Sequence, residues 1–174
     1  DAAVRTAESR SVLAALGVPA EQIYFLGYPD TGMPYEESFL RRLYDGCRVS
    51  ASRWGRTETW RPDGQDLHVM RSGCHSTYTA ASVLRDLSDV LALVNPDTVY
   101  VTAPGDCHGD HDALGRFTTQ AVAAMENPPA LYYYLIHADR TDIWPERDAE
   151  RFRLPPMAAD HPLVAPNYAM QRRD

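Results

Sequence analysis

Apolar side chains recur along this chain at two spacings. In residues 4–16 and 78–94 they return every three or four positions, which predicts amphipathic helices. Shorter patterns of the same kind predict helices over 37–45 and 113–125. Continuous apolar runs bounded by turn residues predict buried strands, namely Ile23–Leu26, Thr98–Thr102 and Leu131–Ile136. Strands that alternate with helices predict an α/β fold with a mostly parallel sheet covered on both faces.

Two segments depart from this alternation. Residues 47–74 are rich in Arg, Trp, Thr and Gly, and the turn sequence Arg61–Gly64 lies between Thr57–Trp60 and Leu67–Met70. This pattern predicts a hairpin or a long surface excursion, with a binding role or no role as equal alternatives. Residues 146–174 show little periodicity and are expected to form an irregular tail.

Composition limits the classes of function. A chain of 174 residues has the size of one domain, so residues 1–174 are expected to form a single α/β domain. The formal net charge of -7 argues against nucleic-acid binding, which uses clustered Lys and Arg. No apolar run approaches the roughly 20 residues that a membrane span needs. Cys47 and Cys74 are candidates for one disulfide, with free thiols as the alternative.

The candidate chemistry lies in the loops that follow the predicted strands. In an open parallel sheet, ligands bind beyond the carboxyl ends of the strands, which here lead into residues 27–32, 103–112 and 137–142. The middle loop is distinctive, and Gly105 and Gly109 allow it to turn tightly. Within seven residues it places two imidazoles among three carboxylates: Asp106, His108, Asp110, His111 and Asp112.

Acidic side chains this close repel one another unless a cation compensates them. Catalytic zinc takes about three His or carboxylate ligands and keeps one position open for water. The bound water then ionises near neutral pH, and a second His nearby can move protons or stabilise an oxyanion. The alternative is a helix N-cap cluster, in which Asp110 or Asp112 caps the following helix and the histidines are exposed.

The stretch 96–111 resembles the second metal motif of the PIG-L or LmbE-like zinc de-N-acetylases, which has the form P-D-x-V-x-T followed by D-x-H-x-D-H. This resemblance implies a Rossmann-like three-layer α/β fold with a mostly parallel sheet. Weaker similarities occur in the family's order at Arg5–Glu8, Leu16–Val18, Phe25–Asp30 and Tyr134–His137.

The resemblance also implies roles for the motif residues. His111 matches the family's zinc ligand. His108 matches the histidine that stabilises the tetrahedral intermediate and protonates the leaving amine. Asp110 matches the carboxylate between them, and an orienting role is expected for it.

Three further residues are expected to bind substrate. Arg5 and Asp30 match family positions that line or brace the pocket, although a structural ion pair between Arg5 and Glu8 on one helix face is an equal alternative. His137 ends a predicted strand at the same rim and is expected to contact substrate, with an exposed surface histidine as the alternative.

One family motif is absent. The first motif, H-P-D-D-E, supplies a His and an Asp to the zinc and an Asp as general base. His68 and His75 lack the adjacent Asp pair and do not replace it. The fold is therefore expected to be incomplete at its N-terminus, without its first strand and metal motif, and a complementing N-terminal segment is an expected partner.

The function implied by the resemblance is zinc-dependent removal of an acetyl group from an N-acetylated amino sugar or glycoconjugate. Two alternatives stay open. A metallo-β-lactamase-fold hydrolase uses the related motif H-x-H-x-D-H but needs later His ligands, for which His161 is the only candidate. A metal-free carbohydrate-binding relative would explain the absent first motif.

Overall fold

The computed structural model describes residues 2–31, 35–46 and 51–137. The expected tail over 146–174 and the Cys47 half of the candidate disulfide lie outside these ranges, and the Cys74 thiol lies 3.5 Å from the Ser72 hydroxyl. The elements in chain order are α1 (Ala2–Ala15), η1 (Ala20–Gln22), η2 (Tyr35–Glu37), α2 (Phe39–Tyr44), α3 (Leu67–Ser72), α4 (Ala80–Val94), β1 (Thr98–Thr102), α5 (Gly109–Ala123) and β2 (Ala130–Tyr134).

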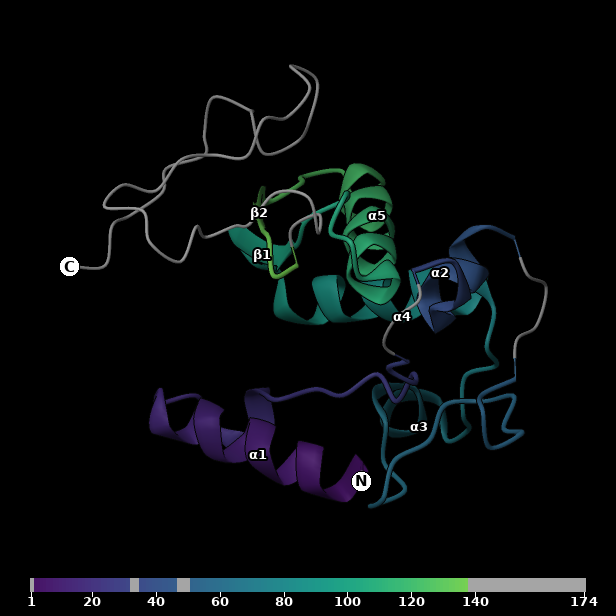
Figure 1. The fold of residues 1–174 in the computed structure, drawn as a ribbon. Helices are drawn as coiled ribbons and strands as arrows, with labels where there is room; N and C mark the ends of the chain where they lie inside the picture. Colours follow the sequence, from purple (N-terminus) through teal and green to yellow (C-terminus); the bar gives the residue numbers. More distant parts are fainter. Residues whose placement is uncertain (1, 32–34, 47–50, 138–174) are drawn as a thin grey trace, which may run out of the picture.

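Strands β1 and β2 form a small open parallel sheet. They run in register from Thr98 opposite Ala130 to Thr102 opposite Tyr134. Helix α5 connects them and packs against β1, which makes a β–α–β unit with both carboxyl ends at one edge (Figure 1). The parallel pairing confirms the α/β class, and two of the three predicted strands are present, at Thr98–Thr102 and Ala130–Tyr134. Within the described ranges the sheet has these two strands, so the three-layer Rossmann-like arrangement stays a prediction.

The predicted strand Ile23–Leu26 is wrong. The segment runs without regular secondary structure, and its carbonyl groups pair with a different part of the chain. The carbonyl of Phe25 accepts from the Leu67 amide at 2.9 Å, and the carbonyl of Gly27 accepts from the Trp60 amide at 3.0 Å. The apolar run indicated partial burial, but a strand also needs a neighbouring strand along its length.

Of the two structures expected for residues 47–74, the hairpin is wrong, and the surface excursion stays a prediction. The second half of this segment is helix α3, which begins where the Asp66 side chain caps a backbone amide and ends at Gly73 in the left-handed conformation. Its first half pairs through an antiparallel bridge between Glu58 and Thr77. The sequence carried both capping signals, but a four-residue segment with three apolar side chains does not distinguish a strand from a single helical turn.

The core lies where α4 and α5 meet and is closed by α2. Thr79 caps α4 by accepting from the Ser82 amide, and Asn95 ends it in the left-handed conformation. Tyr78 packs edge-on against Phe39 with ring centroids 4.8 Å apart. The remaining buried members of this core are Leu43, Val83, Leu87, Leu91, Ala113, Phe117, Ala121 and Val122.

Helix α1 forms as predicted but buries none of its residues. Val4, Val12 and Leu16 are all more than half exposed. The contact that holds it is the Arg10 guanidinium, 3.7 Å from the Asp63 carboxylate and over the Phe25 ring. Figure 1 shows α1 below the α4–α5 pair. No helix in the described ranges has the length and apolar character to cross a membrane.

Gly115 sets the closeness of α5 to β1. A methyl group at this position would press on the Thr102 carbonyl oxygen and lie 2.9 Å from the Pro104 nitrogen. We expect Gly115→Ala to lower the free energy of unfolding by about 1–3 kcal/mol through overpacking. Alanine would otherwise stabilise a helix interior by about 1 kcal/mol.

The measurement is urea denaturation of the two proteins. Ser88→Ala on the exposed face of α4 serves as the control, with an expected change within about 0.5 kcal/mol. Equal or greater stability in Gly115→Ala would contradict this close approach.

Candidate functional site

The acidic and imidazole side chains gather at the carboxyl edge of the sheet. Residues 103–108 leave β1, and α5 begins at Gly109, so His111 lies in the first turn of the helix rather than in a loop. His108 occupies the N-cap position, but its side chain caps no backbone amide. His137 follows β2 at the same edge. Gly109 is required by close approach, because a methyl group there would press on the Tyr35 carbonyl.

The buried carboxylate of Asp106 holds this edge together. One oxygen accepts from the Ile136 amide at 3.0 Å and the His137 amide at 3.1 Å, and the other accepts from the His108 amide at 2.9 Å. The Nδ1 atom of His111 lies 3.4 Å from the first oxygen. A side chain from the end of β1 therefore fixes the chain that leaves β2, and it is fully buried while doing so.

Three imidazole rings stack above this carboxylate. The ring centroids of His108 and His111 are 4.4 Å apart, and His137 lies 5.2 Å from His111 and 5.6 Å from His108. The planes differ by 22–26°. Imidazole rings gathered at the strand ends in this way can bind a metal ion through their ring nitrogens.

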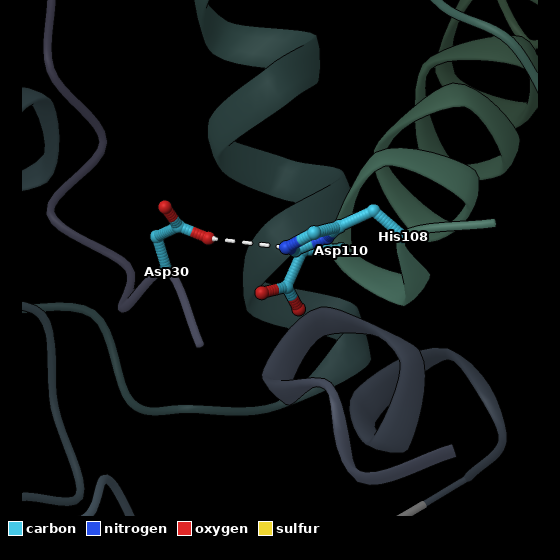
Figure 2. A group of neighbouring side chains, drawn as sticks. All are labelled: Asp30, His108 and Asp110. Carbon is cyan, nitrogen blue, oxygen red and sulfur yellow. Dashed lines mark ion pairs between the residues drawn. The ribbon is translucent and has the colours of Figure 1, made fainter. Parts of the chain in front are cut away.

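The expected site residues Asp30, His108 and Asp110 also converge. One potential ligand atom from each lies within 4.8 Å of the other two. The Oδ1 atom of Asp30 faces the Nε2 atom of His108 at 3.9 Å (Figure 2). Asp30 is 87% exposed, so this contact is solvated. The Nδ1 atom of His108 is buried and has no hydrogen-bond partner within the described ranges.

Asp110 uses its carboxylate to hold the upstream chain. One oxygen accepts from the Leu40 amide at 2.7 Å. The other accepts from the amide and the hydroxyl of Thr31 at 2.9 and 3.0 Å. Figure 2 shows its carboxylate beside that of Asp30 and the imidazole of His108. Since both oxygens already accept hydrogen bonds, Asp110 positions the Asp30 loop and α2 around the histidines.

Asp112 is a second positioning carboxylate. It accepts from the Gly105 amide at 2.7 Å, and it pairs with the Arg41 and Arg116 guanidinium groups at 2.7 and 2.9 Å. The Tyr35 hydroxyl donates to it at 3.0 Å. Burial alone raises the pKa of Asp112, but the hydrogen bonds from Arg116, Gly105 and Tyr35 outweigh burial and hold the pKa below the usual 3.8. Burial and this bond to Asp112 raise the pKa of Tyr35 to about 12.

Arg5 does not join this group. It lies on α1, is 83% exposed and pairs with Glu8 at 2.9 Å, which is the structural ion pair considered as the alternative. Sequence reasoning did not find the roles of Tyr35 and Arg41, because no motif marks a residue that reaches Asp112 from a distant helix. The role of Asp106 in joining the two strand ends had a signal in the sequence, because Asp106 is the first residue of the D-x-H-x-D-H motif.

The donor atoms fit a divalent metal ion. His111 directs Nδ1 toward the Asp106 carboxylate and so leaves Nε2 for a ligand, which is the carboxylate–histidine pairing common at zinc sites. The Nδ1 atom of His108 is also available as a ligand, because it is buried and has no hydrogen-bond partner within the described ranges. A buried polar atom left unpaired costs about 1–3 kcal/mol, which a bound ion, water or substrate would recover.

A β–α–β unit with histidines and carboxylates at its strand ends is the arrangement of a hydrolytic or metal-binding site. Comparison with known families gives the class directly. The PIG-L family, described as GlcNAc-PI de-N-acetylase, matches residues 1–122, and the chain belongs to this family of deacetylases. The match supports this family over the metallo-β-lactamase alternative. Comparisons with curated proteins and with solved structures found no match.

The contacts of Asp112 predict a pH-dependent loss of stability in Asp112→Asn. Removing a buried charge that two guanidinium groups face should cost about 3 kcal/mol. Because the folded pKa is lowered, this stabilisation is complete above the unfolded pKa of about 3.9 and is lost as the pH falls toward the folded value.

We therefore expect the stability difference between the two proteins to be constant from about pH 5 to 7 and to shrink below about pH 4. Urea denaturation across this range measures it. Asp97→Asn, which changes an exposed carboxylate, should show almost no difference at any pH. A difference that grows on acidification would contradict the lowered pKa.

Proposed function

We propose that this chain contributes the second metal motif of a zinc-dependent hydrolase that removes an acetyl group from an N-acetylated amino sugar or glycoconjugate. The observation that carries the proposal is the stack of three imidazoles fixed by the buried Asp106 carboxylate at the strand ends. A deacetylase family match extends over this motif. Within such a family, an amide is the bond to be broken and a sugar amine is the leaving group.

The proposed residue roles are those that the family resemblance implies, and the contacts support them. His111 is the proposed zinc ligand, with Asp106 fixing its ring through Nδ1. Zinc in this position supplies Lewis-acid activation of water and of the acetyl carbonyl. The reaction adds water to the carbonyl carbon, breaks the carbon–nitrogen bond and releases acetate and the free amine.

His108 is the proposed acid that gives a proton to the departing nitrogen. Its ring is nearly buried in the stack and faces Asp30, which can orient it. Asp110 supports this pair by holding the Thr31 backbone next to Asp30. His137, exposed at the rim of the stack, is the proposed substrate contact. Arg5 is left out of this site because its contacts lie on α1.

We further propose that a complementing segment supplies the remaining ligands and the general base. A catalytic zinc takes about three protein ligands. Asp110 accepts hydrogen bonds from Thr31 and Leu40, so His111 is the one zinc ligand that we assign to this chain. The absent H-P-D-D-E motif is the family's source of a His, an Asp and a base, and its carrier would dock at the histidine stack.

Zinc binding tests the ligand assignment. The 174-residue chain should bind zinc through His111 more weakly than a three-ligand site does, and His111→Ala should lower the zinc bound by one ion per chain. Competition with a chromogenic chelator measures the difference in zinc bound by the two proteins. Equal binding would remove His111 as a ligand, and tight binding that depends on His111 in this chain alone would contradict the need for a complementing segment. An assembly that binds an amino sugar but shows neither zinc nor turnover would favour the metal-free carbohydrate-binding alternative.

Turnover tests the role of His108. In the active assembly, His108→Ala should lower kcat for deacetylation by about two to four orders of magnitude, since it removes an acid and an oxyanion donor. KM and the zinc content should change little, because His108 is not the assigned ligand. Elemental analysis and steady-state kinetics on one preparation separate these effects. Near-normal kcat, or loss of zinc together with activity, would show that the assigned role is wrong.

A further inference from the structure

A second group of ligand atoms lies away from the histidine stack, between α3 and α4. It consists of the Nδ1 atom of His68 and carboxylate oxygens of Asp86 and Asp89, all within 4.8 Å of one another. We propose that these three side chains form a second divalent-metal site that takes zinc. The site joins α3 to α4 and is independent of the proposed catalytic zinc.

The strongest support is a buried carboxylate oxygen that accepts no hydrogen bond. The Asp86 side chain is 1% exposed, yet its Oδ1 atom has no hydrogen-bond partner within the described ranges. It faces the Nδ1 atom of His68 at 3.2 Å, and that nitrogen is also buried and unpartnered. The two atoms lie at ion-pair distance but form no hydrogen bond with each other, so the cost of their desolvation is only partly compensated. A shared cation satisfies both atoms at once.

The elements present these ligands in a suitable arrangement. Asp86 and Asp89 are three residues apart on α4, so both carboxylates lie on the same face of one helix. His68 comes from α3, which is fixed at its start by the Asp66 cap. One imidazole and two carboxylates match the ligand types of zinc and leave a position for water.

An outer hydrogen bond supports the central ligand. The Tyr28 hydroxyl donates to the Oδ2 atom of Asp86 at 2.7 Å, which directs Oδ1 toward His68. Ligating carboxylates at metal sites are commonly held by such outer partners. The same bond fixes the backbone two residues before Asp30, so the second site would also restrain the loop that faces His108.

Neighbouring arginines do not fill the site. The Nε atom of Arg85 lies 3.6 Å from Asp86, and the Nε atom of Arg71 lies 3.6 Å from Asp89. Both distances exceed the 2.7–2.9 Å of a charge-assisted hydrogen bond. The two side chains are 49% and 40% exposed, and the Arg85 guanidinium donates instead to the Ser76 hydroxyl at 2.6 Å.

Zinc titration in the His111→Ala background tests this proposal and removes the first proposed site from the measurement. We expect this protein to bind one zinc ion. Adding His68→Gln or Asp89→Asn should weaken that binding at least tenfold, whereas adding Asp97→Asn, an exposed carboxylate outside the group, should leave it unchanged. Isothermal titration with zinc chloride gives stoichiometry and affinity, and circular dichroism confirms that each variant is folded.

The nitrogen resonances of His68 provide a second measurement, in which the three proposed ligands His68, Asp86 and Asp89 all remain in place. Zinc added to the His111→Ala protein should shift the Nδ1 resonance of His68 to that of a metal-bound imidazole. A hydrogen-bonded His68–Asp86 ion pair would instead leave this resonance unchanged by zinc. That result, or binding unaffected by Asp89→Asn, overturns the second site and leaves the proposed catalytic role of His111 intact.

Discussion

The carboxylate of Asp106 is fully buried, and the positions of all three stacked histidines depend on the hydrogen bonds it accepts. It receives the amides of His108, Ile136 and His137 and lies beside the His111 ring. A buried carboxylate is costly unless its oxygens are satisfied, so folding of this edge requires that the two strand ends meet here. The stack of imidazoles is a consequence of that requirement.

Two acidic residues of the motif support the site by binding distant parts of the chain. Asp110 and Asp112 are buried in the first turn of α5, where the helix dipole favours negative charge. Each then uses its oxygens to fix a different upstream segment, Asp110 through Thr31 and Asp112 through Tyr35 and Arg41. A motif that reads as a set of metal ligands is therefore largely a scaffold that brings distant residues to His108 and His111.

The spacing of apolar residues predicted the elements that are determined mainly by their local sequence. Helix α4 has a strong amphipathic pattern together with a Thr79 cap and an Asn95 stop, and both strands of the sheet were found from short apolar runs. The strands predicted at Ile23–Leu26 and Leu67–Met70 are wrong, because the secondary structure of a short, largely apolar segment depends on the segment it packs against. In both cases this is the other segment, through the bond between the Phe25 carbonyl and the Leu67 amide.

The candidate site was predictable only as far as its residues are close in sequence. His108, Asp110 and His111 form one motif, and His137 was expected at the same rim because parallel strands end at one edge. Tyr35 and Arg41 approach from elements more than 60 residues earlier, and no local pattern marks them. The group formed by His68 and Asp86 has the same character, since a helical i, i+3 spacing of acids is usually a solvated surface feature.

The segment from Tyr28 to Thr31 connects the two groups of ligand atoms. At its start the Tyr28 hydroxyl bonds to Asp86, and at its end Thr31 bonds to Asp110. Asp30 lies between these anchors and is exposed, so its approach to His108 is set by the bonds on either side rather than by its own packing. A change at Asp86 that lengthens the Tyr28 bond would therefore move Asp30 relative to the histidine stack without altering any residue of the stack. The structure thus links a buried carboxylate on α4 to the geometry of a site on α5 through four residues of irregular chain.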